Sequence, residues 1–350
     1  MSAPGRSQAL IPEPFKGEGT PVSPHGRPKG ESRSAQHEGT PIQTFVKAVE
    51  CWVPGIDRRH LEYGGGLYGQ ATRFAVLSRK LCFGRGEGLP GKAWEQGRPL
   101  LLKAFEGSYF QRTAAAHAEG LTGALAWPIF AGEYLNAVLV VFFGDGDDHA
   151  GAIELWCNDP AESKDMGLAD GHYGRTAEAF EFISRRTTFR RGTGLPGLAW
   201  DSGLPVFLPD LGKGSRFLRS DSAQRVGINR GLALACAGND GRHHVVALLS
   251  ALNTPIVRRF EVWQREGEGL ARMSGFCESE GELGPEPTLV ERGQGTLGSA
   301  LLNGVPAVCD DVASEPGGLG AKLRRAAVQT LVAIPVLRDG RCIAVMAWYF

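Results

Sequence analysis

The sequence lacks the features that mark a membrane, secreted or nucleic-acid-binding protein. It has no run of about 18 apolar residues and no apolar signal core near its N-terminus. Lysine and arginine together number 38, and so do aspartate and glutamate, so no net charge attracts the chain to nucleic acid or to an anionic membrane. We therefore expect a cytoplasmic protein with neither a nucleic-acid nor a membrane partner.

The motifs of metal sites and of common enzymes are missing too. The seven cysteines are scattered and never spaced C-x-x-C, which disfavours a disulfide framework or a zinc site. We find no G-x-S-x-G nucleophile motif, histidine-kinase box, helix-turn-helix or phosphodiesterase metal cluster. The sequence thus predicts no metal ligand, no cofactor and no output module.

What the sequence does contain is one pattern that occurs three times. "RGEGLPGKAW", "RGTGLPGLAW" and the degenerate copy "RGQGTLGSAL" have their first glycines 106 and 101 residues apart, at Gly86, Gly192 and Gly293. "VECW", "IELW" and "FEVW" follow nearly the same period and end at Trp52, Trp156 and Trp263. Two independent landmarks with one period indicate an internal triplication into domains of about 100 residues.

Composition and period together set the expected domain boundaries. Residues 1–40 are rich in Pro, Gly, Ser and mixed charge and contain few large apolar residues, so we expect a disordered tail. The three repeats are then expected at residues 41–146, 147–254 and 255–350.

Each repeat has the same expected order of elements. A strand that ends in the tryptophan pairs with a second stretch such as "GQATRFAVLSRKLCF", and the glycine motif then leads into a short helix and another strand. A polar, partly helical segment precedes a final hairpin, which is indicated by polar turns at residues 131–133 and 338–340. This order predicts an α+β fold with an antiparallel sheet in each repeat.

The glycine motif spells most of two nucleotide-binding fingerprints, G-x-G-x-x-G and G-x-x-x-x-G-K. Its context fits neither, because a polar segment precedes it, a hairpin follows it, and Ala93 stands where a Mg²⁺-binding Ser or Thr is needed. We interpret the motif as mechanical: Gly86 and Gly88 allow a positive φ, Pro90 starts a short helix, and Trp94 holds that helix to the sheet.

The pattern F-x-R-G-x-G-L-P-G-x-A-W-x-x-G-x-P, with the later "FQRTAAAHAEGLTGALAWPIFAGEYLNAVLVVFF", closely resembles the GAF domain, a sensory module of signalling proteins. The resemblance covers most of residues 45–144 and 151–255 and is weak in the third repeat. It implies a PAS-like antiparallel sheet with short helices and loops on one face that enclose a pocket. It also implies dimerisation and a small ligand, since GAF domains bind cyclic nucleotides, bilins, haem or metabolites.

The resemblance further implies where a ligand binds. Phe110 and Arg112, with their counterparts Phe217 and Arg219, lie in the segment that roofs the GAF pocket, and arginine suits a carboxylate or phosphate. A surface salt bridge or a helix-end cap is the alternative role of these arginines. Trp127 is expected either to line the pocket or to fill the core. The third repeat lacks the Phe-x-Arg element, so we expect it to be structural.

The chain departs from GAF domains because it has no room for the helices that cover the second sheet face. Only nine residues separate Phe143 from Ile153, and only seven separate Leu252 from Phe260. The sequence also stops on its closing strand, which leaves open whether it is a truncated product. We expect the sheet faces to be covered by repeat-on-repeat packing, or else by a protein partner or self-association.

Three functions are open at this point. The first is a non-enzymatic sensory or signalling protein that binds a small ligand in the first or second repeat and acts through protein contacts. The second is an interaction scaffold whose pockets are filled by side chains. The third is a thiol redox enzyme that resembles free methionine sulfoxide reductase, which would need a low-pKa cysteine with a second thiol nearby.

Overall fold

The tryptophan-bearing strand of each repeat lies inside an antiparallel sheet. The computed structural model describes residues 43–144, 151–174, 178–316 and 318–350. The tail expected at residues 1–40 and the boundary expected at residue 146 lie outside these ranges. The residues in these four ranges form one compact unit.

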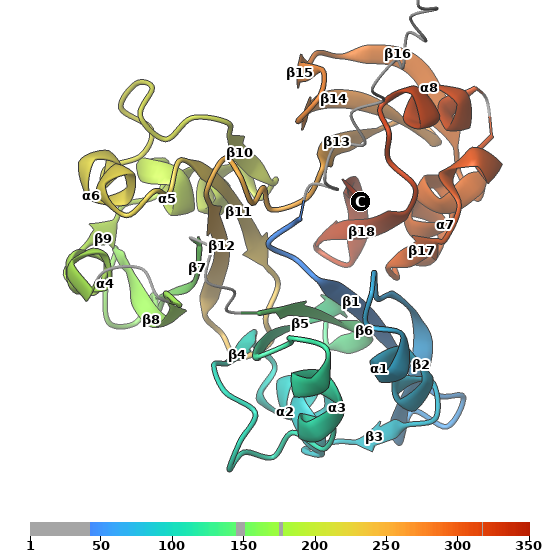
Figure 1. Cartoon of the computed structure of the whole chain (residues 1–350), viewed down its shortest axis with the longest axis horizontal. Helices are drawn as coiled ribbons and strands as arrows, with labels where there is room; N and C mark the ends of the chain where they lie inside the picture. The colour runs from blue at the N-terminus through green and yellow to red at the C-terminus, as the bar shows by residue number, and fades with distance from the viewer. Residues whose placement is uncertain (1–42, 145–150, 175–177, 317) are drawn as a thin grey trace, which may run out of the picture. The chain divides into compact units, whose positions relative to one another are not determined.

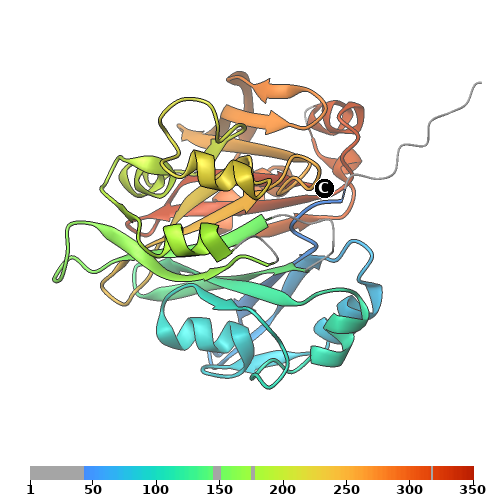
Figure 2. The ribbon, with the colours of Figure 1, turned by 60° about the vertical axis from the view of Figure 1, so that its left-hand side comes forward.

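The first repeat consists of β1–β6 and α1–α3. Its strands have the order β3-β2-β1-β6-β5-β4 and are antiparallel throughout. The three helices lie on one side of this sheet (Figures 1 and 2). The bounds are β1 Ala48–Pro54, β2 His60–Leu67, α1 Thr72–Ser78, β3 Cys82–Gly84, α2 Gly88–Gln96, β4 Leu100–Leu102, α3 Thr113–Ala118, β5 Gly123–Ala131 and β6 Tyr134–Phe143.

The second repeat, β7–β12 with α4–α6, has the equivalent order β9-β8-β7-β12-β11-β10. The third repeat, β13–β19 with α7, η1 and α8, has the order β15-β14-β13-β19-β18-β17, and β16 also pairs with β14. The bounds in the second repeat are β7 Gly151–Asn158, β8 Met166–His172, α4 Glu178–Ser184, β9 Thr188–Phe189, α5 Gly194–Ser202, β10 Val206–Leu208, α6 Ser220–Arg225, β11 Arg230–Cys236 and β12 His243–Ser250. Those in the third are β13 Arg259–Glu266, β14 Gly269–Cys277, β15 Gly281–Leu283, β16 Glu286–Glu291, α7 Gly295–Asn303, β17 Ala307–Cys309, η1 Val312–Ser314, α8 Leu319–Arg325, β18 Leu331–Arg338 and β19 Arg341–Tyr349.

Three antiparallel sheets of equivalent strand order confirm the predicted α+β fold. The helix expected after the glycine motif is α2, which has Pro90 in its first turn and packs Trp94 against the core of the first repeat. None of the helices in the described ranges is long and apolar enough to span a membrane.

One expected element is wrong. The partner of β1 is not the stretch "GQATRFAVLSRKLCF" but the glycine-rich β2 before it. Residues 72–78 form α1 instead, because Phe74, Ala75 and Ser78 fall on one helical face, which is buried, whereas Val76 and Leu77 are exposed.

The two faces of each sheet belong to different cores, as β6 illustrates. Val138, Val140 and Phe142 pack in the core on the helical side of the first repeat. The alternate residues Leu139 and Val141 point to the other face, because successive side chains on a strand point in opposite directions.

The second faces of the three sheets share one hydrophobic core. It contains buried side chains of every repeat, among them Leu139, Leu248 and Met346, each of them 0% exposed. The faces for which the sequence has no covering helices therefore cover one another. This agrees with the expected repeat-on-repeat packing, and these faces do not require a partner protein.

Polar contacts between the repeats form a closed cycle. In each of these contacts, the final hairpin of one repeat donates a hydrogen bond to the C-terminal end of the glycine-motif helix in a neighbouring repeat. The second repeat contacts the first in this way, the third contacts the second, and the first contacts the third. The donor–acceptor pairs are Asn239–Gly97 at 2.9 Å, Arg338–Ser202, and Asn136–Gly304 at 3.1 Å.

Candidate functional site

A buried carboxylate on β1 organises the interior of the first repeat. Glu50 is fully buried, and its Oε2 accepts a hydrogen bond from Trp52 Nε1 at 3.0 Å. The two side chains share a face because they are two positions apart on a strand. Arg112 donates to both carboxylate oxygens, at 2.5 and 3.0 Å, and Tyr68 OH donates to Oε1 at 3.2 Å. Arg112 also donates to Ser78 Oγ, so its guanidinium is held by the protein's own groups.

The second repeat contains the same network. Glu154 accepts from Trp156 Nε1 at 3.0 Å and from Arg219 at 2.5 and 2.8 Å. Tyr173 OH donates to this carboxylate at 3.0 Å, and Arg219 also donates to Ser184 Oγ. The network therefore belongs to the repeated unit rather than to one repeat.

The third repeat keeps the carboxylate but has different arginines. Glu261 accepts from Trp263 Nε1 at 2.9 Å and from Tyr349 OH at 2.7 Å. In place of a Phe-x-Arg element, Arg259 donates to it at 2.7 Å and Arg272 of β14 donates at 2.9 Å. A glutamate, a tryptophan and at least one arginine are thus joined in all three repeats.

The glutamate is the residue that the sequence analysis missed. Its signal lies in "VECW", "IELW" and "FEVW", where glutamate stands two positions before tryptophan each time. A charged residue kept in all three copies of an apolar strand indicates a buried partner of opposite charge, because a buried unpaired charge is very unfavourable.

The five predicted site residues fall into three places, and all five are buried. The guanidinium carbon of Arg112 lies 5.2 Å from the ring centre of Phe110. Arg219 and Phe217 repeat this contact at 5.1 Å. Trp127 is separate from both pairs, because its side chain lies in the shared core on the other face of the sheet. Contact of these residues with a ligand stays a prediction.

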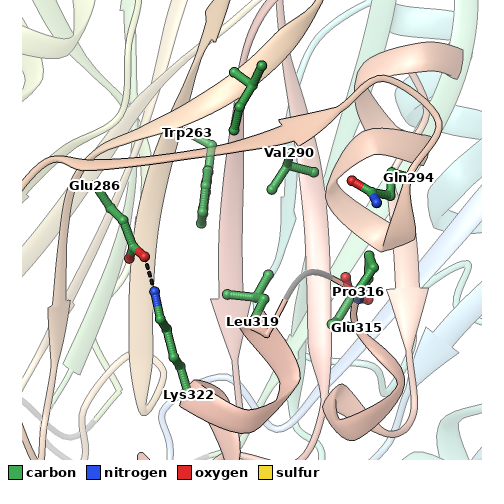
Figure 3. Close-up of a pocket in the computed structure, with 9 residues that line it drawn as sticks. Trp263, Glu286, Val290, Gln294, Glu315, Pro316, Leu319 and Lys322 are labelled. Carbon is green, nitrogen blue, oxygen red and sulfur yellow. Dashed lines mark hydrogen bonds and ion pairs between the residues drawn. The ribbon is translucent and has the colours of Figure 1, made fainter.

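Three cavities lie among the described residues, and neither Arg112 nor Arg219 lines any of these three. One cavity, in the third repeat, measures about 20 Å³, roughly enough for a water molecule, and is bordered by the Glu286–Lys322 ion pair (Figure 3). A second, of about 10 Å³, lies between the second and third repeats, and a third, of about 350 Å³, lies between the first and second. At the two arginines only the Nε atoms lack a hydrogen-bond partner.

The surroundings of the network fix its charge states. Burial has the largest effect on Glu154 and by itself would raise its pKa, but Arg219 and hydrogen bonds from Trp156 and Ser184 bring the pKa below its ordinary value. Burial and the adjacent carboxylate raise the pKa of Tyr173. At neutral pH the carboxylate is therefore ionised and the tyrosine is a protonated donor, so the cluster is a static ion pair.

The backbone of the glycine motif makes local turns. Gly86 N donates to Gly91 O at 2.8 Å and Gly91 N donates to Glu87 O at 3.0 Å, so these N–H groups are already used. Gly86 and Gly88 have φ values of +82° and +57°, and a Cβ on Gly91 would lie 2.1 Å from Gly84 O. The same features recur in the other two copies, which supports the mechanical interpretation.

The cysteines are unpaired and mostly shielded. All seven are free, and burial raises the pKa of Cys51 to about 12 and that of Cys342 to about 11. Cys82 is exposed. Within the described ranges, no three His, Cys, Asp or Glu side chains are grouped so as to hold a metal ion.

No family model and no curated protein matches the chain. Among solved structures, free methionine-R-sulfoxide reductase from Neisseria meningitidis is 17% identical over 30% of this chain and 53% of that chain, with a TM-score of 0.22.

Two further solved structures are similar to this chain. The A. Aeolicus nlh2 GAF domain in an inactive state is 23% identical over 29% of this chain and 60% of that chain, with a TM-score of 0.23. The GAF domain of a phosphoenolpyruvate-protein phosphotransferase from Coxiella burnetii is 19% identical over 28% of this chain and 56% of that chain, with a TM-score of 0.24. This chain thus spans less than two thirds of the length of each, and both are GAF domains, the family that its glycine motif resembles.

Proposed function

We propose that this chain is a non-enzymatic interaction scaffold of GAF-like repeats in which the interior of each repeat is filled by its own side chains. The observation that carries the proposal is the Glu–Trp–Arg network, which is present in all three repeats. A ligand sensor of the kind expected from the sequence needs an arginine that is free to meet a ligand, whereas a scaffold needs none.

Release of the arginine would leave an unfavourable charge behind. A ligand that drew Arg219 away from Glu154 would leave a fully buried carboxylate without its countercharge. Breaking a buried pair in this way costs about 3–5 kcal/mol. The bidentate geometry of the pair makes it one of the stronger polar contacts in proteins, so the ligand would have to replace a strong interaction before it gained anything.

A thiol redox function has less support. A reactive cysteine needs a lowered pKa, since the thiolate is the nucleophile. Burial instead raises the pKa of Cys51, Cys157 and Cys342.

A double-mutant cycle in the second repeat tests the proposal. Arg219→Met and Glu154→Gln should each destabilise the protein by about 3–5 kcal/mol in urea unfolding, and the double variant should lose much less than their sum. The exposed pair Arg185 and Glu181, 2.5 Å apart, is the matched control, with an expected coupling of about 0.5 kcal/mol or less.

Native mass spectrometry of the freshly purified chain tests the alternative, a ligand-sensing function, by detecting any bound small molecule. A co-purified small molecule that is lost in Arg219→Met, with the unfolding curve unchanged, would establish the ligand-sensing function in place of the scaffold.

A further inference from the structure

The largest of the three cavities is a groove between the first and second repeats, outside the filled interiors. Its volume is about 350 Å³, against about 20 and 10 Å³ for the other two, so of these three it alone has room for an organic molecule. Lys92 and Arg98 line it from the first repeat, and Asp170 and His244 line it from the second.

The two cations on the first-repeat side have no carboxylate partner among the described residues. Both Lys92 and Arg98 are partly buried. Lys92 Nζ lies 4.9 Å from the centre of the Tyr109 ring, and Arg98 donates to the Gln96 amide oxygen at 2.8 Å. Neither charge is therefore neutralised by a carboxylate. Partial burial in the groove strengthens the attraction of each cation for an anion.

The other charged groups of the groove do not cancel these two. Asp170 is already paired with Lys103 at 2.6 Å, and His244 Nε2 is bonded to Asp240 at 2.8 Å. Burial lowers the pKa of His244 and outweighs Asp240, which raises it, and the charges of Arg98 and Arg242 add to the lowering. Lys92, Arg98 and Lys103 still outnumber Asp170 and Asp240, so the charge that remains is positive.

The fold itself does not require cations at these positions. The residues that correspond to Lys92 and Arg98 are Leu198 and Leu204 in the second repeat and Ser299 and Val305 in the third. The cations are therefore a property of this one groove rather than of the repeated unit.

The groove is also bordered by a smaller side chain than the one at the corresponding position of the second repeat. Leu101 of β4 corresponds to Phe207 of β10, since each is the middle residue of its strand. The Phe207 ring packs 5.4 Å from that of Phe260 and 5.5 Å from that of Phe276, and so fills the space between the second and third repeats. The smaller Leu101 lines the groove between the first and second repeats.

We propose that this groove binds a small organic anion, a carboxylate or phosphate group carried on an apolar body. Arg98 offers a planar pair of donors to the anionic group and Lys92 adds a second charge. Leu101, Leu155 and the Tyr109 ring contact the body. Because the ligand touches both repeats, it stabilises the contact between them.

Phenyl phosphate is the probe, titrated calorimetrically into the full chain, and benzyl alcohol is its uncharged analogue. We expect saturable binding of phenyl phosphate, weaker binding of inorganic phosphate, and none of benzyl alcohol. The variant Lys92→Leu/Arg98→Leu, which copies the second repeat, should bind about tenfold more weakly or worse. Arg85→Gln, an exposed arginine outside the groove, should bind like the wild type.

Leu101→Phe is an independent test of the groove, because the larger side chain should fill it and abolish phenyl phosphate binding while both cations remain. Thermal unfolding of each variant verifies that it is folded. The proposal is overturned if the wild type does not bind phenyl phosphate at millimolar concentration, or if the double variant keeps wild-type affinity. Equal binding of benzyl alcohol or of inorganic phosphate would overturn the assignment to an organic anion.

Discussion

At the scale of single residues, the interior of each repeat depends on one buried carboxylate. Glu50, Glu154 and Glu261 are each fully buried, and each binds a tryptophan N–H and at least one arginine. A buried pair adds little stability over an apolar core of the same volume, but it becomes strongly destabilising once a partner is lost. The three carboxylates are therefore expected to tolerate substitution poorly.

The network should make stability depend on pH through Glu154. Burial, the largest effect, opposes ionisation, but Arg219 outweighs it together with hydrogen bonds, so the folded-state pKa lies below the ordinary value of about 4.3. Such a group contributes its full stabilisation when the pH is above the pKa that it has in the unfolded chain. This contribution is lost as the pH falls through the pKa that it has in the folded protein. Urea unfolding between about pH 7 and pH 3 should show a steeper loss in the wild type than in Glu154→Gln.

Glu106→Gln is the control for this experiment, since its carboxylate is 63% exposed and pairs only with the half-exposed His117 among the described residues. Its stability curve should parallel that of the wild type. Parallel curves for Glu154→Gln as well would contradict the assigned role of Glu154.

Sequence alone singled out Arg112 and Arg219 but could not tell a ligand anchor from an ion pair. The partner carboxylates lie 62 and 65 residues away along the chain. No local pattern links residues at that distance, and only the folding of β1 and β7 beside the Phe-x-Arg segments brings the charges together.

At the scale of elements, the glycine motif fixes how a short helix meets its sheet. In the second repeat a Cβ on Gly197 of α5 would lie 2.2 Å from Arg190 O. Gly197→Ala should therefore destabilise the protein by about 1–3 kcal/mol through overpacking, as measured by urea unfolding.

Gly167→Ala in β8 is the matched control, because a Cβ there meets nothing within 4 Å. Its stability should stay within about 0.5 kcal/mol of the wild type. An equal loss in both variants would mean that glycine flexibility, and not close packing, explains the motif.

Elements specified by residues close together in the sequence were predictable, whereas those that depend on tertiary pairing were not. The hairpin of β5 and β6 was predictable, because a tight polar turn and two apolar runs specify it within one segment. The partner of β1 was not, because β2 contains three consecutive glycines, Gly64–Gly66, and takes its strand conformation from pairing with β1.

At the scale of the whole molecule, the shared core should make the three repeats unfold together. Leu248 of β12 is 0% exposed and lies in this core. Leu248→Ala should cost about 2–5 kcal/mol and lower one common calorimetric transition. Leu252→Ala, at a side chain that is 58% exposed, should leave that transition in place. Separate transitions, of which Leu248→Ala shifts only one, would show that the repeats are independent.

By itself the sequence determined the triple period, the α+β class and the mechanical role of the glycines, because each of these depends on residues that are close together in the chain. Only the tertiary structure decided that Arg112 and Arg219 meet buried carboxylates, that three sheet faces share one core, and that a cationic groove opens between two repeats. These features join residues from distant segments, and their energies depend on burial, which exists only once the sheets have packed.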